Sequence, residues 1–434
     1  MNNDNRNICL KILNEHGQSD LHINDCIHSY FKLNDISRPD RAFINRLTLG
    51  VIRLKGRYDY ILSQIYHGDY KELNFRLKNI LRLGCYQIEE MDSIPNHASI
   101  FRMVEITKKH LRGYEKLTNA ILRKFVNKST EIKLDINSPN TYPLLSHPDW
   151  IISRWTRQFG VKKTLQLCDY NNKIPIIWFR INDYLGIEKI YRDIKLLSLT
   201  IKKHALSNLF FKVNSPETLM KSNIFTKGYV SVQNPTNSFI VDVLNPKNTE
   251  TIIDGCASPH GKGSLISLRA PNSKIYSIEI NKKRIIKIKE SINRHKLKNI
   301  NILNLDMAKD ELPRADKILL DVPCSGTGVV NRRVDLRWKR KEVDILKSTQ
   351  LQEQILSNAS KYLKRGGRIV YSTCSIEDEE NNIIVENFIK KNRGYSLEDC
   401  SRWVNSKLVK NKKIDIFPGE YDLDGGFAAT LKRI

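Results

Sequence analysis

Several features that would place the chain in common protein classes are missing. No apolar run among its 434 residues approaches the roughly 20 residues of a membrane-spanning helix. Residues 1–7 lack the basic-then-apolar pattern of a secretion signal. None of the eight cysteines forms a Cys-x-x-Cys pair, which argues against a zinc ribbon, and without a secretion signal we expect no disulfides. We therefore expect a cytoplasmic protein without a membrane partner or a metal. We also expect a monomer.

Acidic residues are too few to balance the basic ones. The chain has 72 Lys and Arg against 47 Asp and Glu, a net charge of +25. Residues 1–140 hold 22 basic and 16 acidic residues, which leaves +19 of the net charge for residues 141–434. This excess favours a polyanion, RNA or DNA, as partner. A solvated basic surface without a partner is the plainer alternative, and an anionic membrane is disfavoured because no helix pairs a basic face with a bulky apolar one.

The hydrophobic pattern changes twice along the chain. Apolar residues recur at helical spacing up to about residue 135, and a polar, proline-containing stretch follows. Short β-like runs then mix with helices, and from about residue 238 strands and helices alternate, which predicts an α/β fold with a mostly parallel, doubly wound sheet. We predict a helical domain at 1–138, a small α+β domain at 146–235 and a Rossmann-like domain at 236–434. The predicted strands of the last domain are Glu250–Asp254, Lys274–Glu279, Asn301–Asp306, Lys317–Asp321, Arg368–Ser372 and Gly426–Ile434.

The two common nucleotide fingerprints are also absent. The loop Asp254-Gly-Cys-Ala-Ser-Pro-His-Gly-Lys262 follows the first of these strands, but it fits neither G-x-G-x-x-G nor the P-loop pattern. An acid stands at the end of each of the first four strands: Asp254, Glu279, Asp306 and Asp321. A carboxylate after the second strand suits ribose hydroxyls. The ordered set favours an adenosyl ligand over a dinucleotide.

Two cysteines follow the last two parallel strands. Cys324 lies in Asp321-Val-Pro-Cys-Ser-Gly-Thr-Gly328, and Cys374 lies in Tyr371-Ser-Thr-Cys-Ser375. Ligands bind at the carboxyl ends of such strands, where an activated thiol can act as a nucleophile. Burial as small hydrophobic residues is the alternative for each cysteine. With Asp321 nearby, we favour catalysis, with one thiol attacking and the other assisting.

A basic and aromatic segment follows the Cys324 loop. It reads Asn331-Arg-Arg-Val-Asp-Leu-Arg-Trp338. Its arginines would suit phosphates and Trp338 would suit a base. A surface helix start with Trp338 in the core is an equally good interpretation.

These motifs resemble the RNA cytosine-5 methyltransferases, specifically the bacterial Sun/Fmu (RsmB-type) 16S rRNA enzymes. The blocks that carry the resemblance are the 254–262 loop, the two cysteine blocks and Asp335-Leu-Arg-Trp338. The resemblance extends over nearly the whole chain. It implies that residues 1–138 form an all-α NusB-like RNA-binding domain, for which Leu81-Arg-Leu-Gly-Cys-Tyr86 and Asn119-Ala-Ile-Leu-Arg123 are typical blocks.

The resemblance also implies roles for individual residues. Cys374 is the expected nucleophile, Cys324 the residue that helps release the product, and Asp321 the acid near the methyl donor and the flipped cytosine. S-adenosylmethionine is the expected cofactor, and 16S ribosomal RNA is the expected partner. The residues expected to bind S-adenosylmethionine are Cys256, Ala257, Ser258, Pro259, His260, Gly261, Lys262, Glu279, Asp306 and Asp321.

The chain departs from the family pattern at two places. His260-Gly-Lys-Gly263 stands where the family usually has Gly-Gly-Lys-Thr, and Asn331 and Val334 replace a common arginine and proline. Two alternative functions stay open: methylation of tRNA, and a non-catalytic RNA-binding assembly factor, which the His260 loop suggests.

Overall fold

The computed structural model describes residues 4–135, 138–182 and 186–434, and the chain divides into two compact units. The first comprises residues 1–174 and 330–340, and the second comprises residues 175–329 and 341–434. Over the described residues, no helix is both long enough and apolar enough to cross a membrane.

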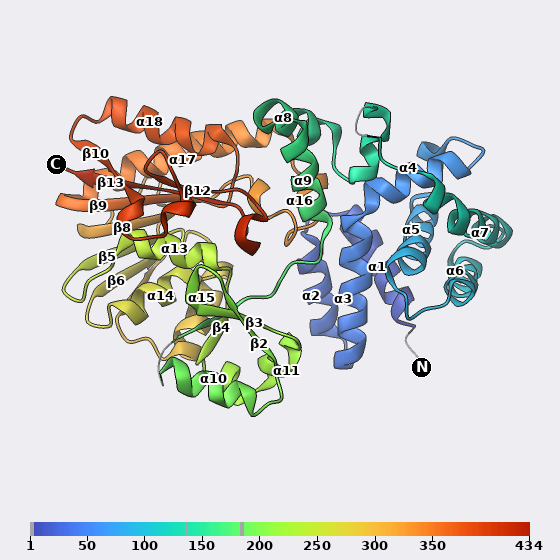
Figure 1. Cartoon of the computed structure of the whole chain (residues 1–434), viewed down its shortest axis with the longest axis horizontal. Helices are drawn as coiled ribbons and strands as arrows, with labels where there is room; N and C mark the ends of the chain where they lie inside the picture. Colours follow the sequence, from blue (N-terminus) through green and yellow to red (C-terminus); the bar gives the residue numbers. More distant parts are fainter. Residues whose placement is uncertain (1–3, 136–137, 183–185) are drawn as a thin grey trace. The chain divides into compact units, whose positions relative to one another are not determined.

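The first unit is built from helices, as predicted (Figure 1). A single apolar core joins α1 to α7, with Leu10, Leu47 and Phe125 fully buried in it. Helix α3 shows how the sequence sets a boundary, because the Ser37 hydroxyl accepts a hydrogen bond from the Asp40 N–H just before the helical stretch. The helices are α1 Asn5–Gly17, α2 Ile23–Leu33, α3 Arg38–Arg53, α4 Lys55–Ile65, α5 Phe75–Glu90, α6 Asn96–His110, α7 Glu115–Glu131, α8 Asp149–Phe159, α9 Val161–Asn172 and α16 Leu336–Lys339, with 3-10 turns at Tyr70–Glu72 and Pro139–Leu145.

The second unit begins with a small four-stranded antiparallel sheet. Its strand order is β2-β3-β1-β4, and Phe179 of β1 pairs with Phe211 of β3 and Val232 of β4. Short helices cover its apolar face, where Ile190, Ile194 and Leu219 are buried. The elements are β1 Phe179–Ile181, α10 Ile187–Lys195, β2 Ile201–His204, β3 Ser207–Val213, α11 Pro216–Lys221, α12 Asn223–Thr226 and β4 Val230–Val232.

The larger sheet of this unit carries the predicted Rossmann-like architecture. Its strand order is β11-β12-β13-β9-β8-β5-β6-β7, with β10 added beside β13. Strands β5 to β9 pair in parallel, whereas β10 to β13 form antiparallel pairs. The strands are β5 Thr251–Gly255, β6 Lys274–Ile278, β7 Ile300–Leu303, β8 Ala315–Asp321, β9 Leu363–Thr373, β10 Tyr395–Glu398, β11 Val409–Lys410, β12 Lys413–Ile416 and β13 Gly426–Arg433.

Helices cover both faces of this sheet (Figure 1). Ile318 and Ile369 pack on the face that holds α17 and α18, and their neighbours Leu319 and Val370 pack on the opposite face with α13 and α14. This alternation follows from the period of two in a strand and explains why the strands are apolar throughout. The helices are α13 Pro235–Leu244, α14 Gly261–Arg269, α15 Lys282–His295, α17 Glu342–Tyr362 and α18 Asn382–Lys391. The predicted strands are present with shifted ends, the third one by three residues at Asp306.

The segment after the Cys324 loop belongs to the helical unit. Val334 lies in the core of that unit, and Arg337 is fully buried, donating hydrogen bonds to the backbone carbonyls of Ser146 and Asn171. Trp338 packs against the same core and donates from its indole to the Ile52 carbonyl. These contacts support the core interpretation of Trp338 over base stacking.

Asp335 is the polar anchor of this segment. Its carboxylate lies 3.0 Å from His22 Nδ1 and 3.5 Å from His16 Nε2, and it accepts a hydrogen bond from the Ile23 N–H. Burial by itself would raise the pKa of Asp335, but these partners together lower it to about 2. The ionised carboxylate therefore stabilises the junction of α1, α2 and α16.

We expect Asp335→Asn to destabilise the helical unit by about 2 kcal/mol at neutral pH, because the lowered pKa makes the charged form contribute to folding. The difference from wild type should shrink as pH falls from about 4 toward 2, the range in which the native carboxylate takes up its proton. Urea unfolding combined with hydrogen exchange of residues 5–33 measures this difference in the free energy of unfolding. Asp25→Asn, an exposed acid of α2, is the control, and an equal effect of both variants would contradict the account.

Candidate active site

The loop between β5 and α14 turns sharply beneath the carboxyl edge of the sheet. Cys256 and His260 both adopt left-handed backbone conformations, with φ of 59° and 79°. Gly263 is closely enclosed: a β-carbon at this position would lie 2.3 Å from Asp254 Oδ2 and 2.5 Å from His260 Nε2. Only glycine therefore fits at this point of the first helical turn.

Asp254 is a buried carboxyl group without a full set of partners. It is 1% exposed, and its Oδ2 atom is buried with no hydrogen-bond partner among the residues that the structure describes. Burial raises the pKa of Asp254 well above its usual value, Asp321 adds to this effect, and Lys262 opposes it. Buried groups of this kind are often retained at functional sites, where a ligand supplies the missing partner.

We expect Asp254→Asn to be more stable than wild type at pH 7.5, by at least about 1 kcal/mol. Because the pKa of Asp254 is higher in the folded protein than in the unfolded chain, the native state binds more protons above about pH 4, and wild-type stability falls as pH rises past that value. The asparagine variant lacks this cost, and its advantage should diminish toward pH 4. Urea unfolding at several pH values measures it, with exposed Glu188→Gln as control. A less stable Asp254→Asn protein at pH 7.5 would refute the assignment.

Asp321 is held from two elements at the end of β8. Lys262 Nζ of α14 donates a hydrogen bond to Asp321 Oδ2 over 2.7 Å, and the Ser372 hydroxyl of β9 lies 3.4 Å from Oδ1. Lys262 belongs to the loop predicted to bind the cofactor, and the structure adds a direct contact between its side chain and Asp321. The Lys262–Asp321 ion pair therefore joins the 254–262 loop to the strand end that leads into the Cys324 loop.

The two cysteine loops meet at the same edge. Cys324 Sγ and Cys374 Sγ are 3.2 Å apart, although 50 residues separate them in sequence. The parallel pairing of β8 with β9 places Asp321 opposite Ser372, and the Gly328 N–H donates to the Cys374 carbonyl. The hydrogen bond with Cys374 and burial raise the pKa of Cys324 well above its usual value. Cys324 is therefore a neutral thiol that can donate a hydrogen bond to Cys374.

Glu380 supports both cysteine loops, a role that the sequence analysis missed. Its buried carboxylate accepts hydrogen bonds from the Ser325 N–H and hydroxyl, at 2.8 and 2.5 Å, and from the Gln352 side chain. Its backbone carbonyl accepts from the Tyr371 hydroxyl. Glu380 is one acid in the run Glu377-Asp-Glu-Glu380, in which Glu377 is also buried and Asp378 is exposed, and nothing in the sequence distinguishes the buried acids from the others.

Glu279 and Asp306 follow the next two strands at the same edge. Glu279 is buried, and its Oε1 atom accepts one hydrogen bond, from the Asn281 N–H. Asp306 accepts from the Ala308 N–H, and Asn304 donates to the Glu279 carbonyl, which ties the two strand ends together. The structure thus brings the four strand-end acids to one edge, with Asp254 and Asp321 in one electrostatic cluster.

His260 points inward rather than into the cofactor loop. Its ring nitrogens lie 3.1 Å from the Ser277 hydroxyl and 3.4 Å from the Ser291 hydroxyl. Burial, with a smaller effect of His295, lowers the pKa of His260 to about 3, so the ring is neutral. The departure from the family's glycine therefore adds hydrogen bonds between the loop, β6 and α15.

A buried arginine from the small sheet supports the start of α14. Arg180 of β1 donates to the Gly261 carbonyl over 3.2 Å and lies 3.3 Å from the Ser264 hydroxyl. Gln233 and Asn182 accept its other N–H groups. This contact could not be predicted from the sequence, because Arg180 lies 81 residues before Gly261.

Comparison with known proteins agrees with this architecture. Residues 241–432 match the family model described as 16S rRNA methyltransferase RsmB/F, residues 3–127 match the NusB family, and residues 147–192 match an RsmF/B-like ferredoxin-like domain. The ribosomal RNA small subunit methyltransferase B of Photorhabdus laumondii is 31% identical over 412 residues, covering 92% of both chains. The chain belongs to the RsmB/F family. The resemblance stated from sequence and the expectation of an RNA methyltransferase are thereby confirmed.

Two further relatives extend over nearly the full length. A probable ribosomal RNA small subunit methyltransferase B of Bacillus subtilis is 27% identical, covering 99% of this chain and 98% of its own. The crystal structure of PH0851 has a TM-score of 0.81 at 22% identity and covers 99% of this chain and 98% of its own, which supports the fold. For this RsmB/F-family chain, the division into domains at 1–138, 146–235 and 236–434 stays a prediction.

Proposed function

We propose that the protein methylates C5 of a cytosine in 16S ribosomal RNA, using S-adenosylmethionine and a covalent bond between Cys374 and C6 of the base. The observation that carries this proposal is the 3.2 Å approach of Cys324 Sγ and Cys374 Sγ beside Asp321. Curated relatives named ribosomal RNA small subunit methyltransferase B support the choice of RNA.

The donor side of the edge fits S-adenosylmethionine. Asp254 has a buried oxygen without a partner, Gly263 leaves no room for a side chain, and Glu279 has one carboxylate oxygen free of the Asn281 contact. In this proposal residues 256–262 would line S-adenosylmethionine. Glu279 would accept hydrogen bonds from its ribose hydroxyls, and Asp306 would lie near its adenine. When bound, S-adenosylmethionine supplies an electrophilic methyl group. Lys262 holds Asp321 in position, and the backbone N–H groups of Asn281 and Ala308 hold Glu279 and Asp306.

The proposed reaction depends on making C5 of cytosine nucleophilic. Cys374 Sγ, as a thiolate, bonds to C6, the C5–C6 double bond opens, and C5 becomes enamine-like and takes the methyl group. The C5 proton then passes to water at the site, the double bond re-forms with the electron pair of the C5–H bond, and the C6–S bond breaks to return the Cys374 thiolate. In this proposal N3 takes up a proton that it shares with Asp321, and this proton neutralises the negative charge that arrives on the ring, with Lys262 beside the carboxylate. The cytosine must leave its stack to reach the two cysteine loops.

Cys324 is assigned to product release. As a neutral thiol 3.2 Å away, it donates a hydrogen bond to Cys374 Sγ and so assists departure of that sulfur from C6. Because the thiols occupy one site, removing either one should stop turnover, but at different stages.

We expect Cys374→Ala to abolish methyl transfer to unmodified 16S rRNA, at least 1,000-fold by order of magnitude, since the nucleophile is absent. Cys324→Ala should lose turnover but accumulate a denaturant-stable protein–RNA adduct. Transfer of labelled methyl and denaturing electrophoresis measure the two effects, with the buried thiol variant Cys400→Ala as control. Full activity of Cys374→Ala would overturn the proposal. Transfer to tRNA but not to rRNA, on naked RNA or partly assembled subunits, would change the substrate class.

We expect Glu279→Gln to weaken S-adenosylmethionine binding by about tenfold, because the amide loses the charge of a buried carboxylate that accepts ribose hydroxyls. Titration calorimetry on the full chain measures the dissociation constant. Glu290→Gln, an exposed acid of α15, makes the same chemical change away from the edge. Equal affinity of Glu279→Gln and wild type would remove Glu279 from the donor site. No measurable binding by wild type would favour a non-catalytic assembly factor.

A further inference from the structure

The helical unit contains a cavity that the methyl-transfer site does not use. Its volume is about 600 Å³, within the roughly 300–1,000 Å³ of typical ligand sites. Four stretches of the same unit line it: residues 13–22, 51–55, 75–82 and 336–340. The last of these is the Trp338 segment, so this motif helps to build the cavity.

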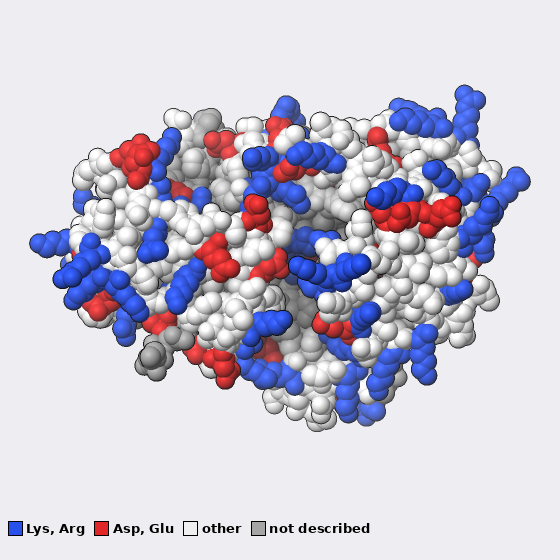
Figure 2. All heavy atoms as spheres, turned by 180° about the vertical axis from the view of Figure 1, so that it is seen from behind, with Lys and Arg blue, Asp and Glu red and all other residues white. Residues whose placement is uncertain are grey.

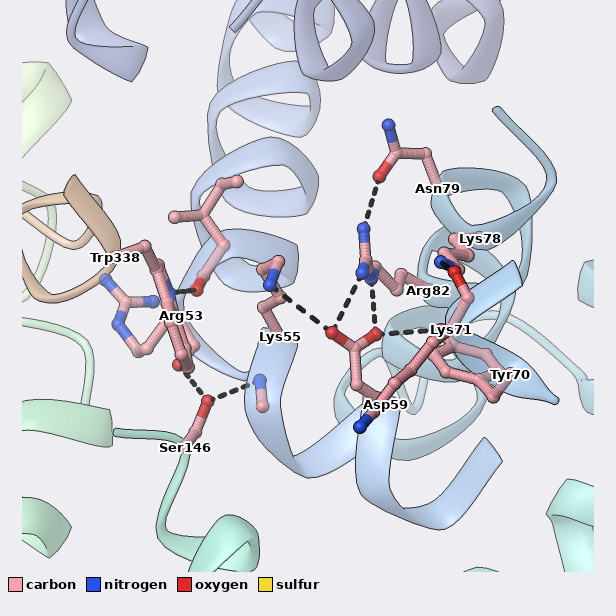
Figure 3. Close-up of polar contacts among 12 residues, drawn as sticks. Arg53, Lys55, Asp59, Tyr70, Lys71, Lys78, Asn79, Arg82, Ser146 and Trp338 are labelled. Carbon is pink, nitrogen blue, oxygen red and sulfur yellow. Dashed lines mark hydrogen bonds and ion pairs between the residues drawn. The ribbon is translucent and has the colours of Figure 1, made fainter. Parts of the chain in front are cut away.

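Positive charge dominates the lining. Lys55, Arg82, Lys339 and Arg340 line the cavity, against the single acid Asp20. Arg82 forms two hydrogen bonds with Asp59, at 2.7 and 2.8 Å, and Lys55 Nζ lies 3.4 Å from the same carboxylate (Figure 3). Lys55 and Arg82 therefore share the single carboxylate of Asp59, which leaves a net positive charge on this side of the cavity.

The other two cations have no carboxylate among their described contacts. Lys339 Nζ donates to the backbone carbonyls of Ser19 and Leu21. Arg340 Nε is buried without a hydrogen-bond partner, and Ser19 Oγ in the same lining is likewise unpaired. The nearby histidines His16 and His22 face Asp335. Unpaired buried donors beside surplus cations favour an anion with several oxygen acceptors.

Aromatic groups lie next to these cations. Phe75, the first residue of α5, lines the cavity and is 40% exposed, so part of its ring is accessible from the cavity side. Trp338 lies beneath Lys55, whose Nζ is 4.7 Å from the ring centroid (Figure 3). Cations that suit a phosphate, beside an exposed ring that suits a base, are typical of single-stranded nucleic-acid sites.

Burial and the neighbouring Arg82 lower the pKa of Lys55, with Asp59 opposing them. This direction agrees with crowded cations that an anion would stabilise. Figure 2 shows Lys and Arg side chains spread widely over one face of the molecule, and such a surface attracts RNA without selecting a binding position. The cavity supplies a defined position that a dispersed surface charge does not.

We propose that this cavity holds one unstacked nucleotide of the RNA substrate outside the target cytosine, with its phosphate on Arg340, Lys339 and Lys55 and its base on Phe75. The proposal rests on the proposed function for the identity of the RNA. A free mononucleotide carries the same phosphate and base as a nucleotide of RNA. The experiment below distinguishes these two ligands.

The test is fluorescence anisotropy of a labelled dodecauridylate with the full chain at several salt concentrations. Arg340→Gln should weaken binding about fivefold to tenfold and reduce the salt slope by about 0.7, the value for one phosphate contact on a single strand. Phe75→Leu should weaken binding about tenfold with an unchanged salt slope, since stacking is lost. Arg340 makes no side-chain hydrogen bond through Nε, so its variant should fold normally, which thermal unfolding checks.

Matched controls make the same changes elsewhere in the unit. Arg112→Gln and Phe101→Leu alter exposed residues outside the cavity and should bind within about twofold of wild type. Variants Arg340→Gln and Phe75→Leu that bind no worse than these controls would overturn the proposal. Competition by uridine monophosphate as tight as by the unlabelled dodecamer would also overturn it, in favour of a free-nucleotide site.

Methyl transfer by the same variants separates this proposal from the catalytic one. In Arg340→Gln the KM for RNA should rise by the factor seen in binding, with kcat unchanged. A fall in kcat at constant KM would contradict a binding role. A wild-type protein that methylates no RNA would defeat the proposed function, while the anisotropy of the dodecamer would still decide whether the cavity binds RNA.

Discussion

The parallel pairing of β8 with β9 is the constraint on which the candidate active site depends. The register that sets Asp321 opposite Ser372 brings two loops, 50 residues apart in sequence, to the same edge and leaves their thiols 3.2 Å apart. Glu380 then fixes both loops through hydrogen bonds to Ser325 and through the Tyr371 hydroxyl. A shift of one residue in this pairing would turn the strand's side chains to the opposite face and separate Asp321 and Cys324 from Cys374.

The part of the sheet edge proposed to bind S-adenosylmethionine lowers the stability of the folded protein. Asp254 keeps a buried oxygen without a partner, and Cys256 and His260 hold left-handed backbone conformations that side chains rarely adopt. The neutral ring of His260 and the buried guanidinium of Arg180 brace the loop from two sides. Rigid support around an unsatisfied carboxyl group is what a preorganised binding site requires.

The strand-end acids and both cysteines could be predicted because each lies next to an apolar run whose period is readable in the sequence. The helical first domain and the parallel sheet followed from the same periodicity. The support from Arg180 and Glu380 could not be predicted, since it depends on contacts across 81 and 55 residues. Arg337 and Trp338 carry equal signals for RNA contact and for burial, and only their contacts with Ser146 and Ile52 decide for burial.

The most direct test of the central claim is to react the wild-type protein and S-adenosylmethionine with 16S rRNA that contains 5-fluorocytidine. Fluorine at C5 cannot leave as a proton does, so an adduct formed through C6 should persist. We predict a denaturant-stable complex in which peptide mass spectrometry finds the nucleotide on Cys374. An adduct on Cys324, or no adduct from a protein that methylates the unmodified RNA, would contradict the account.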